Sequence, residues 1–339
     1  MNTIVLTGGG TAGHVMPALA LVPYLRKYFA RIAYTGASGG VEERLATAAD
    51  LPFWGTRTIK FDRERPWRNL AIPRVLHRAA GEMATHLEAM HCDVVFSKGG
   101  YCALPTVLAA HRLGLPIVCH ESDLSLGLAN RLSLRYTRHL ITSFDSTPGG
   151  VFMGNPIRDE VFEGRAERVA VPMPAAPTVL VMGGSMGART LNEMAVALCR
   201  ELPTWNVLNL YGNSPIPCAR PNYVGVSFTD RIADYYARAE VVVCRAGANT
   251  LFELAALTKP TVTIPLPKGT SRGDQEQNAA YFGEKYGFTV LSEAGLTPDT
   301  VASAVLDARE GASRHPAFSA SPNARIARYI YDVFAGVTP

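Results

Sequence analysis

Residues 3–17, TIVLTGGGTAGHVMP, join a short apolar run to three consecutive glycines and then to a second apolar stretch. An apolar run that ends in glycines and leads into a helix-type stretch is typical of the turn between a parallel strand and a helix. Glycines at such a turn permit positive φ and a close approach of the backbone to a ligand. The amino end of the following helix offers N–H groups to a phosphate. The stretch therefore predicts a strand, a phosphate-type turn and a helix.

A second stretch, LVMGGSMGART at residues 180–190, repeats this pattern. It aligns with VLTGGGTAGHV at residues 5–15. One such turn is a weak signal, because many of them only pack a helix on a strand. Two turns, each opening one half of the chain, predict two nucleotide-type domains with anionic ligands between them. The matched pairs are Gly9 and Gly183, Gly10 and Gly184, Thr11 and Ser185, and Gly13 and Gly187.

Outside these turns, each half alternates short apolar runs with stretches of helical type. Continuous apolar strands separated by helices predict parallel sheets covered on both faces, which is the doubly wound α/β class. The strand candidates in the first half are TIVLT, RIAYTG, DVVFSKGG, LPIVCHES and HLITSF, and those in the second half are TVLVMGG, NVLNLYG, VVVCRAG and PTVTIPL.

The length of 339 residues predicts two domains. Residues 163–177, EGRAERVAVPMPAAP, end in closely spaced prolines, which favour an extended connector. We therefore expect a first domain at 1–162, this linker at 163–177 and a second domain at 178–325. The remaining residues, 326–339, form a C-terminal tail that we expect to pack back on the first domain.

The composition counts against several classes of protein. No uninterrupted apolar stretch of about 18 residues is present to span a bilayer. No basic segment followed by a long apolar run predicts a secretory signal. The six cysteines form no C-x-x-C pair and lie mostly in apolar runs, which favours reduced thiols in a cytosolic protein over disulfides or a zinc site.

Three catalytic motifs are also missing. Neither glycine turn is followed by the G-K-[ST] of a phosphate-binding P-loop. The acidic residue that holds a dinucleotide ribose, expected about 20 positions after the glycines, is absent, which counts against a nicotinamide oxidoreductase. HESDL at 120–124 is not H-E-x-x-H, because Leu124 stands where a zinc protease needs its second histidine.

Seven motifs, taken together in their order and spacing, resemble the N-acetylglucosaminyltransferases of peptidoglycan synthesis (MurG-type). The resemblance covers roughly residues 3–330 and is specific as a set. It implies the GT-B fold, with two doubly wound Rossmann-like domains facing across a cleft. It also implies transfer of GlcNAc from UDP-GlcNAc to the C4 hydroxyl of MurNAc in lipid I, the undecaprenyl-diphosphate-linked MurNAc-pentapeptide, to form lipid II. The motifs are GGGTAGH, SKGGY, HESD…GLAN, GNPIR, GGSMGARTLN, CRAGANTLFEL and GDQEQNA.

The resemblance places the donor in the second domain. A helix expected to begin near Asn249 or Thr250 suits a diphosphate at its N-terminus. Glu253 matches a glutamate that accepts hydrogen bonds from both ribose hydroxyls. The alternative role for Glu253 is a first-turn carboxylate that interacts favourably with the helix dipole. The backbone of Thr229 matches the position that reads the uracil edge. The remaining matched donor contacts are Thr11, Ala12, Gly13, Asp123, Arg158, Ser185, Ala248, Asn249, Thr250, Leu251, Phe252 and Gln275.

Two of these contacts have simpler alternatives. Arg158 could form a surface ion pair with Asp159 or Glu160, and Gln275 could be a solvated loop amide.

The first domain is expected to hold the acceptor. HESDLSLGLANR begins at the carboxyl end of a strand, where α/β sheets place ligands. Gly9, Gly10 and Thr11 are expected to face the acceptor diphosphate.

The implied reaction is inverting, because the linkage in UDP-GlcNAc is α and that in lipid II is β. One in-line displacement then needs a general base. His14 is the first candidate, since a histidine ordinarily titrates near neutral pH, and Glu121 is its rival. The alternatives are a helix-capping role for His14 and a structural pair of His120 with Glu121.

The sequence contains no D-x-D triplet that would hold a diphosphate-bound metal. We therefore expect no protein-bound metal and no tightly bound cofactor. Free Mg²⁺ could still stimulate the reaction.

Residues 63–79, RERPWRNLAIPRVLHRA, interleave arginines with large apolar side chains. Part of this segment could lie on an anionic membrane, which would place the protein peripherally on the cytoplasmic face of the cell membrane. The alternative is a solvated helix whose apolar face is buried in the domain. No nucleic-acid motif accompanies the basic residues, so no nucleic-acid partner is expected. We define the membrane patch as Arg65, Trp67, Arg68, Leu70, Ile72, Arg74 and Leu76.

Other functions are compatible with parts of this pattern: a UDP-GlcNAc 2-epimerase, a GT-B transferase for another acceptor, or a non-catalytic UDP-sugar or lipid-binding protein. The GGGTAGH turn and the basic segment favour a lipid-diphosphate acceptor. Intact His14, Glu121, Glu253 and Gln275 count against a non-catalytic protein. Pro23 falls inside the helix expected after His14, where a proline should kink it.

Overall fold

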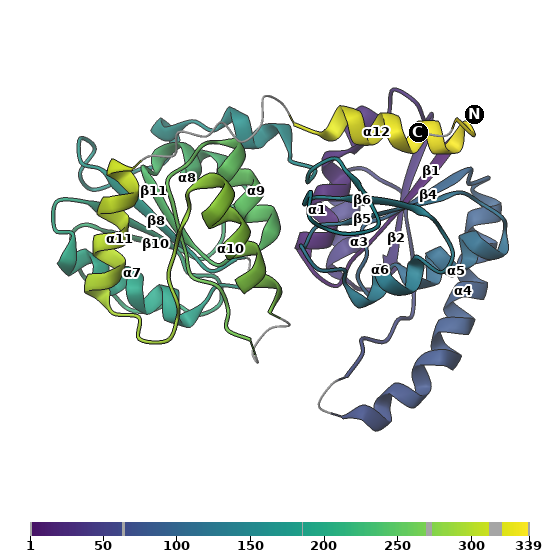
Figure 1. The fold of residues 1–339 in the computed structure, drawn as a ribbon, viewed down its shortest axis with the longest axis horizontal. Coiled ribbons are helices and arrows are strands. Elements are labelled where there is room, and N and C mark those ends of the chain that lie inside the picture. Colours follow the sequence, from purple (N-terminus) through teal and green to yellow (C-terminus); the bar gives the residue numbers. More distant parts are fainter. Residues whose placement is uncertain (1, 63–64, 185, 269–272, 312–320, 338–339) are drawn as a thin grey trace. The chain divides into compact units, whose positions relative to one another are not determined.

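The structure is a computed structural model, which describes residues 2–62, 65–184, 186–268, 273–311 and 321–337. It divides into two compact units, Met1–Arg158 with Ser321–Pro339, and Asp159–Ala320 (Figure 1). The second unit is therefore one continuous segment of chain, whereas the first is assembled from two segments.

The stretch 163–177, expected as an extended linker, lies within the second unit. Its first half contains part of one 3-10 helix, Asp159–Glu163, and all of a second, Ala166–Arg168. The amide of Arg165 donates to Oδ1 of Asp234 at 2.8 Å. The segment is therefore held against its own unit by a hydrogen bond, which the proline-rich composition did not predict.

The first unit is built on a seven-stranded parallel sheet with the order β3-β2-β1-β4-β5-β6-β7. The order reverses at β1, between β2 and β4, and α/β folds bind ligands beyond the carboxyl ends of strands at such a point. The strands are β1 (Thr3–Thr7), β2 (Arg31–Ala37), β3 (Phe53–Thr56), β4 (Val94–Ser97), β5 (Ile117–Glu121), β6 (His139–Thr142) and β7 (Val151–Phe152).

Helices cover both faces of this sheet. Ile4 and Leu6 of β1 belong to a core cluster with α1, α2 and α12, whereas Val5 packs with α4 and α5. The alternation follows the two-residue period of a strand, and burial on both faces explains why β1 is apolar throughout. The helices are α1 (Ala12–Ala20), α2 (Val22–Leu25), α3 (Val41–Ala48), α4 (Ile72–Ala89), α5 (Leu104–Arg112), α6 (Leu128–Ser133) and α12 (Asn323–Phe334).

The second unit repeats this plan with six parallel strands in the order β10-β9-β8-β11-β12-β13. Its strands are β8 (Thr178–Met182), β9 (Asn206–Leu210), β10 (Tyr223–Val226), β11 (Val241–Cys244), β12 (Thr261–Thr263) and β13 (Thr289–Val290). Its helices are α7 (Arg189–Glu201), α8 (Ile232–Arg238), α9 (Ala248–Ala256), α10 (Asp274–Tyr286) and α11 (Pro298–Glu310).

The two glycine turns are alike only in part. Gly10 and Gly184 share a left-handed backbone, with φ of +84° and +86°. Gly13, however, lies within α1, whereas Gly187 has φ of +78° and precedes α7. Thr11 alone separates Gly10 from its helix, while residues 185–188 separate Gly184 from α7. The predicted match of Gly13 with Gly187 is therefore wrong in conformation.

Pro23 does not kink a long helix, because the chain forms two helices there. α1 ends at Ala20, and α2 begins at Val22 with Pro23 in its first turn. A proline is tolerated in the first turn because the missing N–H would have no partner within the helix.

The C-terminal helix α12 completes the first unit. Tyr329, Ile330 and Val333 enter the same core cluster as Phe29. The side chain of Asn323, fully buried, donates from Nδ2 to the carbonyl of Ile157 at 2.6 Å and accepts the Ile157 amide at Oδ1 at 3.2 Å. The helix is therefore tied by both apolar packing and hydrogen bonds to residues more than 160 positions earlier.

Candidate active site

The glycine turn of the first unit follows β1 and lies against a buried carboxylate. Glu42 of α3 is fully buried, and its Oε2 accepts the amide of Gly10 at 3.1 Å. The amide of Gly9 donates to the carbonyl of Gly99 at 3.4 Å. Both amides are thus engaged within the unit and next to a carboxylate. This geometry argues against the expected role of Gly9 and Gly10 in donating hydrogen bonds to the acceptor diphosphate.

Thr11 and His14, at the start of α1, contact each other through their side chains. Thr11 Oγ1 lies 2.9 Å from Nδ1 of His14. Thr11 and Gly13 are exposed, while Ala12 and His14 are half-buried. The contact holds the imidazole with Nδ1 toward Thr11, in the turn and first residues of α1 that follow β1.

Glu121 is the last residue of β5 and is buried. Its Oε1 accepts the amides of Ser122 at 2.9 Å and Asp123 at 3.1 Å. Its Oε2 accepts the amide of Gly127 and Nδ2 of Asn130, both at 2.9 Å. Each of the two side-chain oxygens therefore already has two donors. The geometry therefore favours the structural alternative for Glu121, as the residue that organises the loop after β5.

One buried residue of this loop region was missed by the sequence reasoning. Lys98 follows β4, and its Nζ lies 2.8 Å from Nδ1 of His120 and contacts Oγ of Ser122. Burial lowers the pKa of Lys98 to about 8, against the opposing effect of the nearby charges of Glu121 and Asp123. The available signal was a lysine directly after the apolar run DVVFS.

In the second unit, α9 begins at Ala248 after β11, close to the predicted start of the helix. Gly247 precedes it in an extended conformation, and no acidic residue lies in the first turn. Asn249 and Thr250 are half-buried, so the helix end is partly accessible. Leu251 and Phe252 are buried in the core, which limits any donor contact of these two residues to their backbone.

Glu253 lies one turn into α9, half-buried. The hydroxyl of Tyr236, from α8, donates to Glu253 Oε2 at 3.1 Å. Tyr236 is itself buried and was not predicted as a site residue. It holds the carboxylate through this hydrogen bond, which sequence patterns could not predict because Tyr236 and Glu253 lie on different helices.

The remaining donor candidates lie near the ends of strands and helices. The side-chain Oε1 of Gln275 in α10 accepts the amide of Leu266 at 3.0 Å, so Gln275 holds the chain after β12. Thr229 Oγ1 accepts the amide of Arg231 at 3.0 Å in the turn before α8. Arg158 is half-buried and is the last residue of the first segment of unit one. Ser185 lies outside the described residues.

An ion pair supports the turn that leads into α9. Arg245, directly after β11, makes two 3.0 Å contacts with the carboxylate of Glu293 and also donates to the carbonyl of Ile264 at 3.1 Å. The hydroxyl of Thr190 donates to the same carboxylate at 2.7 Å. The guanidinium of Arg245 holds the pKa of Glu293 below its usual range.

The membrane patch lies at the amino end of α4 and the 3-10 helix before it, Pro66–Ala71. Figure 1 shows this end of α4 extending beyond the rest of the first unit. Trp67 is 65% exposed and Leu70 is 84% exposed, whereas Ile72 and Leu76 are half-buried. Arg65 and Arg74 are exposed, and the side chain of Arg68 is outside the described part of the structure.

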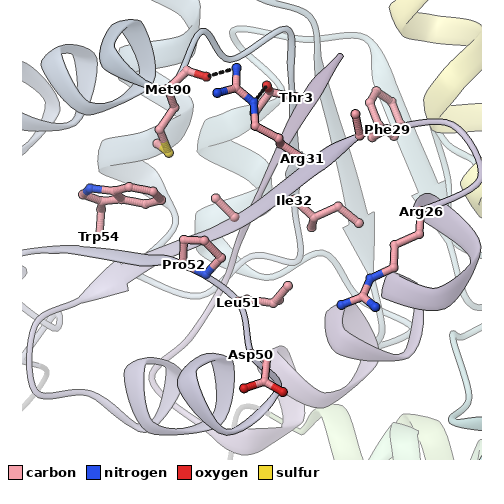
Figure 2. A pocket seen from close by; sticks show the side chains of 12 residues that line it. Thr3, Arg26, Phe29, Arg31, Ile32, Asp50, Leu51, Pro52, Trp54 and Met90 are labelled. Atoms are coloured by element: carbon pink, nitrogen blue, oxygen red, sulfur yellow. Dashed lines mark hydrogen bonds between the residues drawn. The ribbon is translucent and has the colours of Figure 1, made fainter. Parts of the chain in front are cut away.

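A pocket of about 560 Å³ lies elsewhere, at the amino ends of β1 and β2 (Figure 2). Its charged groups do not converge. Arg31 is held at the wall by Thr3 Oγ1 at 3.1 Å and by the carbonyl of Met90 at 3.0 Å, while Arg26 and Asp50 lie on the other side. Because α/β sheets bind ligands at the opposite, carboxyl ends, this pocket is not the candidate active site.

Across the described ranges, no group of three or more His, Cys, Asp or Glu side chains is placed to hold a metal ion. Among the same residues, no helix combines the length and the apolar character needed to cross a bilayer.

Both halves of the chain match domains of one enzyme family. The N-terminal domain of glycosyltransferase family 28 matches residues 4–142, and its C-terminal domain matches residues 178–330. A protein of Lachnospira eligens is 37% identical over 320 residues, which cover 90% of each chain. It is named UDP-N-acetylglucosamine--N-acetylmuramyl-(pentapeptide) pyrophosphoryl-undecaprenol N-acetylglucosamine transferase.

Solved structures share the fold. The crystal structure of MurG from Acinetobacter baumannii aligns with a TM-score of 0.71 at 23% identity, covering 99% of this chain and 100% of that one. A UDP-GlcNAc 2-epimerase from Neisseria meningitidis, solved with UDP-GlcNAc, aligns with a TM-score of 0.66 at 10% identity, covering 99% and 100%. At these identities the structures show the fold alone.

Two Rossmann-like units with both family 28 domains define a glycosyltransferase of the GT-B class. At 37% identity over nine-tenths of both chains, the protein belongs to the family of UDP-N-acetylglucosamine–N-acetylmuramyl-(pentapeptide) pyrophosphoryl-undecaprenol N-acetylglucosamine transferases. The predicted resemblance, fold class and enzyme class are thus confirmed.

Proposed function

We propose that this protein transfers GlcNAc from UDP-GlcNAc to the C4 hydroxyl of MurNAc in lipid I and so forms lipid II. The observation that carries the proposal is the 37% identity, over 90% of both chains, to a transferase named for this reaction. The 2-epimerase alternative has only a fold-level likeness at 10% identity in its favour. A shared fold is weak evidence for a shared activity, because proteins with the same fold catalyse many different reactions.

We place the donor on the second unit. The amino end of α9 would face the diphosphate, where its N–H groups and dipole favour negative charge. Glu253, oriented by Tyr236, would accept the ribose hydroxyls, and the backbone at Thr229 would read the uracil edge. Gln275 and Arg158 would complete the donor contacts.

We assign the general base to His14. Its Nδ1 is held by Thr11, so Nε2 is the ring nitrogen that would take the proton from the C4 hydroxyl. As the new bond from that oxygen to the sugar's C1 forms, the bond from C1 to the UDP oxygen breaks and the configuration inverts. The departing UDP carries negative charge, which the amino end of α9 would stabilise.

The acceptor would bind to the first unit. Since the amides of Gly9 and Gly10 are engaged, we place the acceptor diphosphate at Thr11 and the first residues of α1, Ala12 and Gly13. Asp123, in the loop that Glu121 organises, would contact the GlcNAc end of the donor.

We further propose that the membrane patch attaches the protein to an anionic membrane. An exposed tryptophan and leucine beside exposed arginines suit the interface between acyl chains and anionic headgroups. The undecaprenyl chain of lipid I lies in a membrane, so this attachment would bring enzyme and acceptor together on its cytoplasmic face. We propose no nucleic-acid partner and no tightly bound cofactor, with Mg²⁺ at most stimulatory.

The test is a UDP-release assay with UDP-GlcNAc and a lipid I analogue. We expect UDP release that depends on the acceptor, together with a β-linked disaccharide product. UDP release at the level of a control without acceptor would refute the transferase proposal. Formation of UDP-ManNAc without acceptor would identify a 2-epimerase instead.

A further inference from the structure

Lys98 is a deeply buried cation near the candidate active site. It follows β4 at the carboxyl end of the sheet, 2% exposed. A Cβ on Gly8 would lie only 2.9 Å from Cβ of Lys98, so the lysine stem packs directly beneath the glycine turn. An isolated ammonium in such a place costs much free energy unless its hydrogen bonds are satisfied.

The ammonium is satisfied by residues of β5 and the loop after it. Nζ donates to Nδ1 of His120 at 2.8 Å and to Oγ of Ser122. His120 Nε2 donates to the carbonyl of Gly154 at 3.1 Å, so the imidazole is neutral and its tautomer is fixed. Burial and the charge of Lys98 both lower the pKa of His120, which keeps it in that neutral form.

The hydrogen bonds continue through Ser122. Its hydroxyl donates to Oδ1 of Asn155 at 2.9 Å, and the hydroxyl of Ser143 donates to the same oxygen at 3.1 Å. Lys98 is therefore joined to the ends of β5 and β6 and to the start of the GNPIR segment. The Lys98 ammonium can only donate hydrogen bonds. It therefore determines that Ser122 accepts from Lys98 and donates onward to Asn155.

We propose that Lys98 is a positioning residue for glycosyl transfer, whose ammonium form holds the loop Glu121–Asp123 in its active conformation. This inference rests on the proposed function. The charges of Glu121 and Asp123 favour the ammonium form of Lys98, and the ammonium reaches the loop through its contact with Ser122, whose own amide donates to Glu121. Without the ammonium, Ser122 would lose this donor, and the loop that carries Asp123 would be held less firmly.

The protonation of Lys98 gives the proposal a specific signature. Because its pKa is about 8, transfer should decline above that pH as the ammonium is lost. The contribution of Lys98 to the free energy of unfolding changes with pH in the opposite direction to the rate of transfer. Its folded-state pKa is below the unfolded value, so the unfolded chain binds more protons between the two, and the contribution of Lys98 to stability rises with pH in that window. Deprotonation of Lys98 therefore does not by itself predict unfolding in the pH range where the rate should decline.

The experiment compares Lys98→Met with the wild-type protein between pH 6.5 and 9.5. We expect kcat for the lipid I analogue at neutral pH to fall about 10- to 100-fold, the range typical of misplaced groups near a reaction centre. The alkaline decline should disappear in the variant. None of the residues proposed to contact UDP lies in the loop Glu121–Asp123, so the Kd of UDP should stay within about twofold (a difference under 0.5 kcal/mol).

The chain offers a matched control and a second variant. Lys259 is another lysine whose pKa is lowered by burial, and its Nζ donates to the carbonyl of Ala239 at 2.7 Å, far from the loop in sequence. Lys259→Met should lower the melting temperature and keep the alkaline decline. If Lys98→Met fails to fold, Ser122→Ala removes one partner of the ammonium and should lower kcat while leaving UDP binding unchanged.

Either of two results would overturn the proposal. One is Lys98→Met with wild-type kcat, and the other is Lys98→Met, or Ser122→Ala in its place, with a loss only of thermal stability. If the wild-type protein itself shows no acceptor-dependent transfer, the proposed function fails instead, so the two failures are distinguishable.

Discussion

The hydroxyl of Tyr236 donates a hydrogen bond to Oε2 of Glu253 at 3.1 Å, from a side chain that is itself buried. The hydrogen bond fixes the rotamer of a half-buried carboxylate at the predicted ribose position. Tyr236→Phe removes it with little change of volume. We expect the KM for UDP-GlcNAc to rise about fivefold, the effect of one ordinary hydrogen bond, with kcat nearly unchanged.

Steady-state kinetics with saturating acceptor and calorimetry with UDP measure this effect. Tyr235→Phe, on the neighbouring residue of α8, is the matched control and should leave KM unchanged. A donor with 2′-deoxyribose should reduce the difference between Tyr236→Phe and wild type. An equal difference with both donors would contradict the ribose role of Glu253.

His14→Ala tests the general base. We expect kcat to fall by about 10² to 10⁴, as for removal of other general bases, while UDP binding to the second unit is unchanged. Thr11→Val should produce a smaller fall, because it removes the contact that holds Nδ1. Acceptor-dependent UDP release under saturating conditions is the measurement. Near-full kcat in His14→Ala would remove the assignment.

Glu293→Gln should destabilise the second unit. It breaks the paired contact with Arg245, which is only 8% exposed, and leaves a buried cation without its counter-charge. We expect a loss of about 3 kcal/mol in unfolding free energy at neutral pH. Arg189→Gln, from an exposed pair with Glu193, is the control and should change stability little.

The pH dependence of this loss follows from the lowered pKa of Glu293. A carboxyl whose folded-state pKa is depressed contributes stability above its unfolded pKa and loses that contribution as the pH falls through its folded pKa. The difference between wild type and Glu293→Gln should therefore shrink as the pH is lowered below the ordinary glutamate range. Denaturant unfolding at several pH values measures it, and a difference independent of pH would contradict the pairing.

The membrane patch predicts a specific loss of lipid binding. Trp67→Ala with Leu70→Ala should weaken flotation with liposomes containing anionic lipid, and Arg65, Arg68 and Arg74 changed together to Glu should abolish it. The double variant removes apolar side chains that would contact the lipid acyl chains, and the triple variant removes the attraction to anionic headgroups. Phe162→Ala, which alters an exposed aromatic residue of the second unit, is the control. Unchanged flotation in both patch variants would refute the attachment.

The centre of each sheet could be predicted from the sequence, and its edges could not. The buried strands β1, β4, β5, β8, β9 and β11 have continuous apolar sequences, because both of their faces are covered. The missed strands β3, β7, β10 and β13 lie at or next to a sheet edge and are partly exposed or very short. Their sequences lack the apolar run that identified the others.

Some residues of the candidate site could likewise be predicted from the sequence, and others could not. His14 and Glu253 could be proposed because each follows a recognisable strand–turn–helix pattern. Tyr236 could not, and Lys98 showed only its place after an apolar run, since their roles depend on contacts with residues on other elements, at Glu253 and His120. The engagement of Gly10 by Glu42 was also unpredictable, because a backbone amide shows no sign of its partner in the sequence.

The return of α12 to the first unit affects the order in which the protein can fold during synthesis. The ring of Tyr331 stacks on that of Tyr28 at 4.9 Å and lies 6.1 Å from Phe29. These aromatic side chains of the first segment are made before the second unit, and the helix that covers them is made after it. The second unit, contiguous in sequence, can close while the first still exposes an uncovered core face. The first unit therefore begins to be synthesised before the second but completes its core after it. Until then, its exposed apolar face is the surface that a chaperone would need to bind.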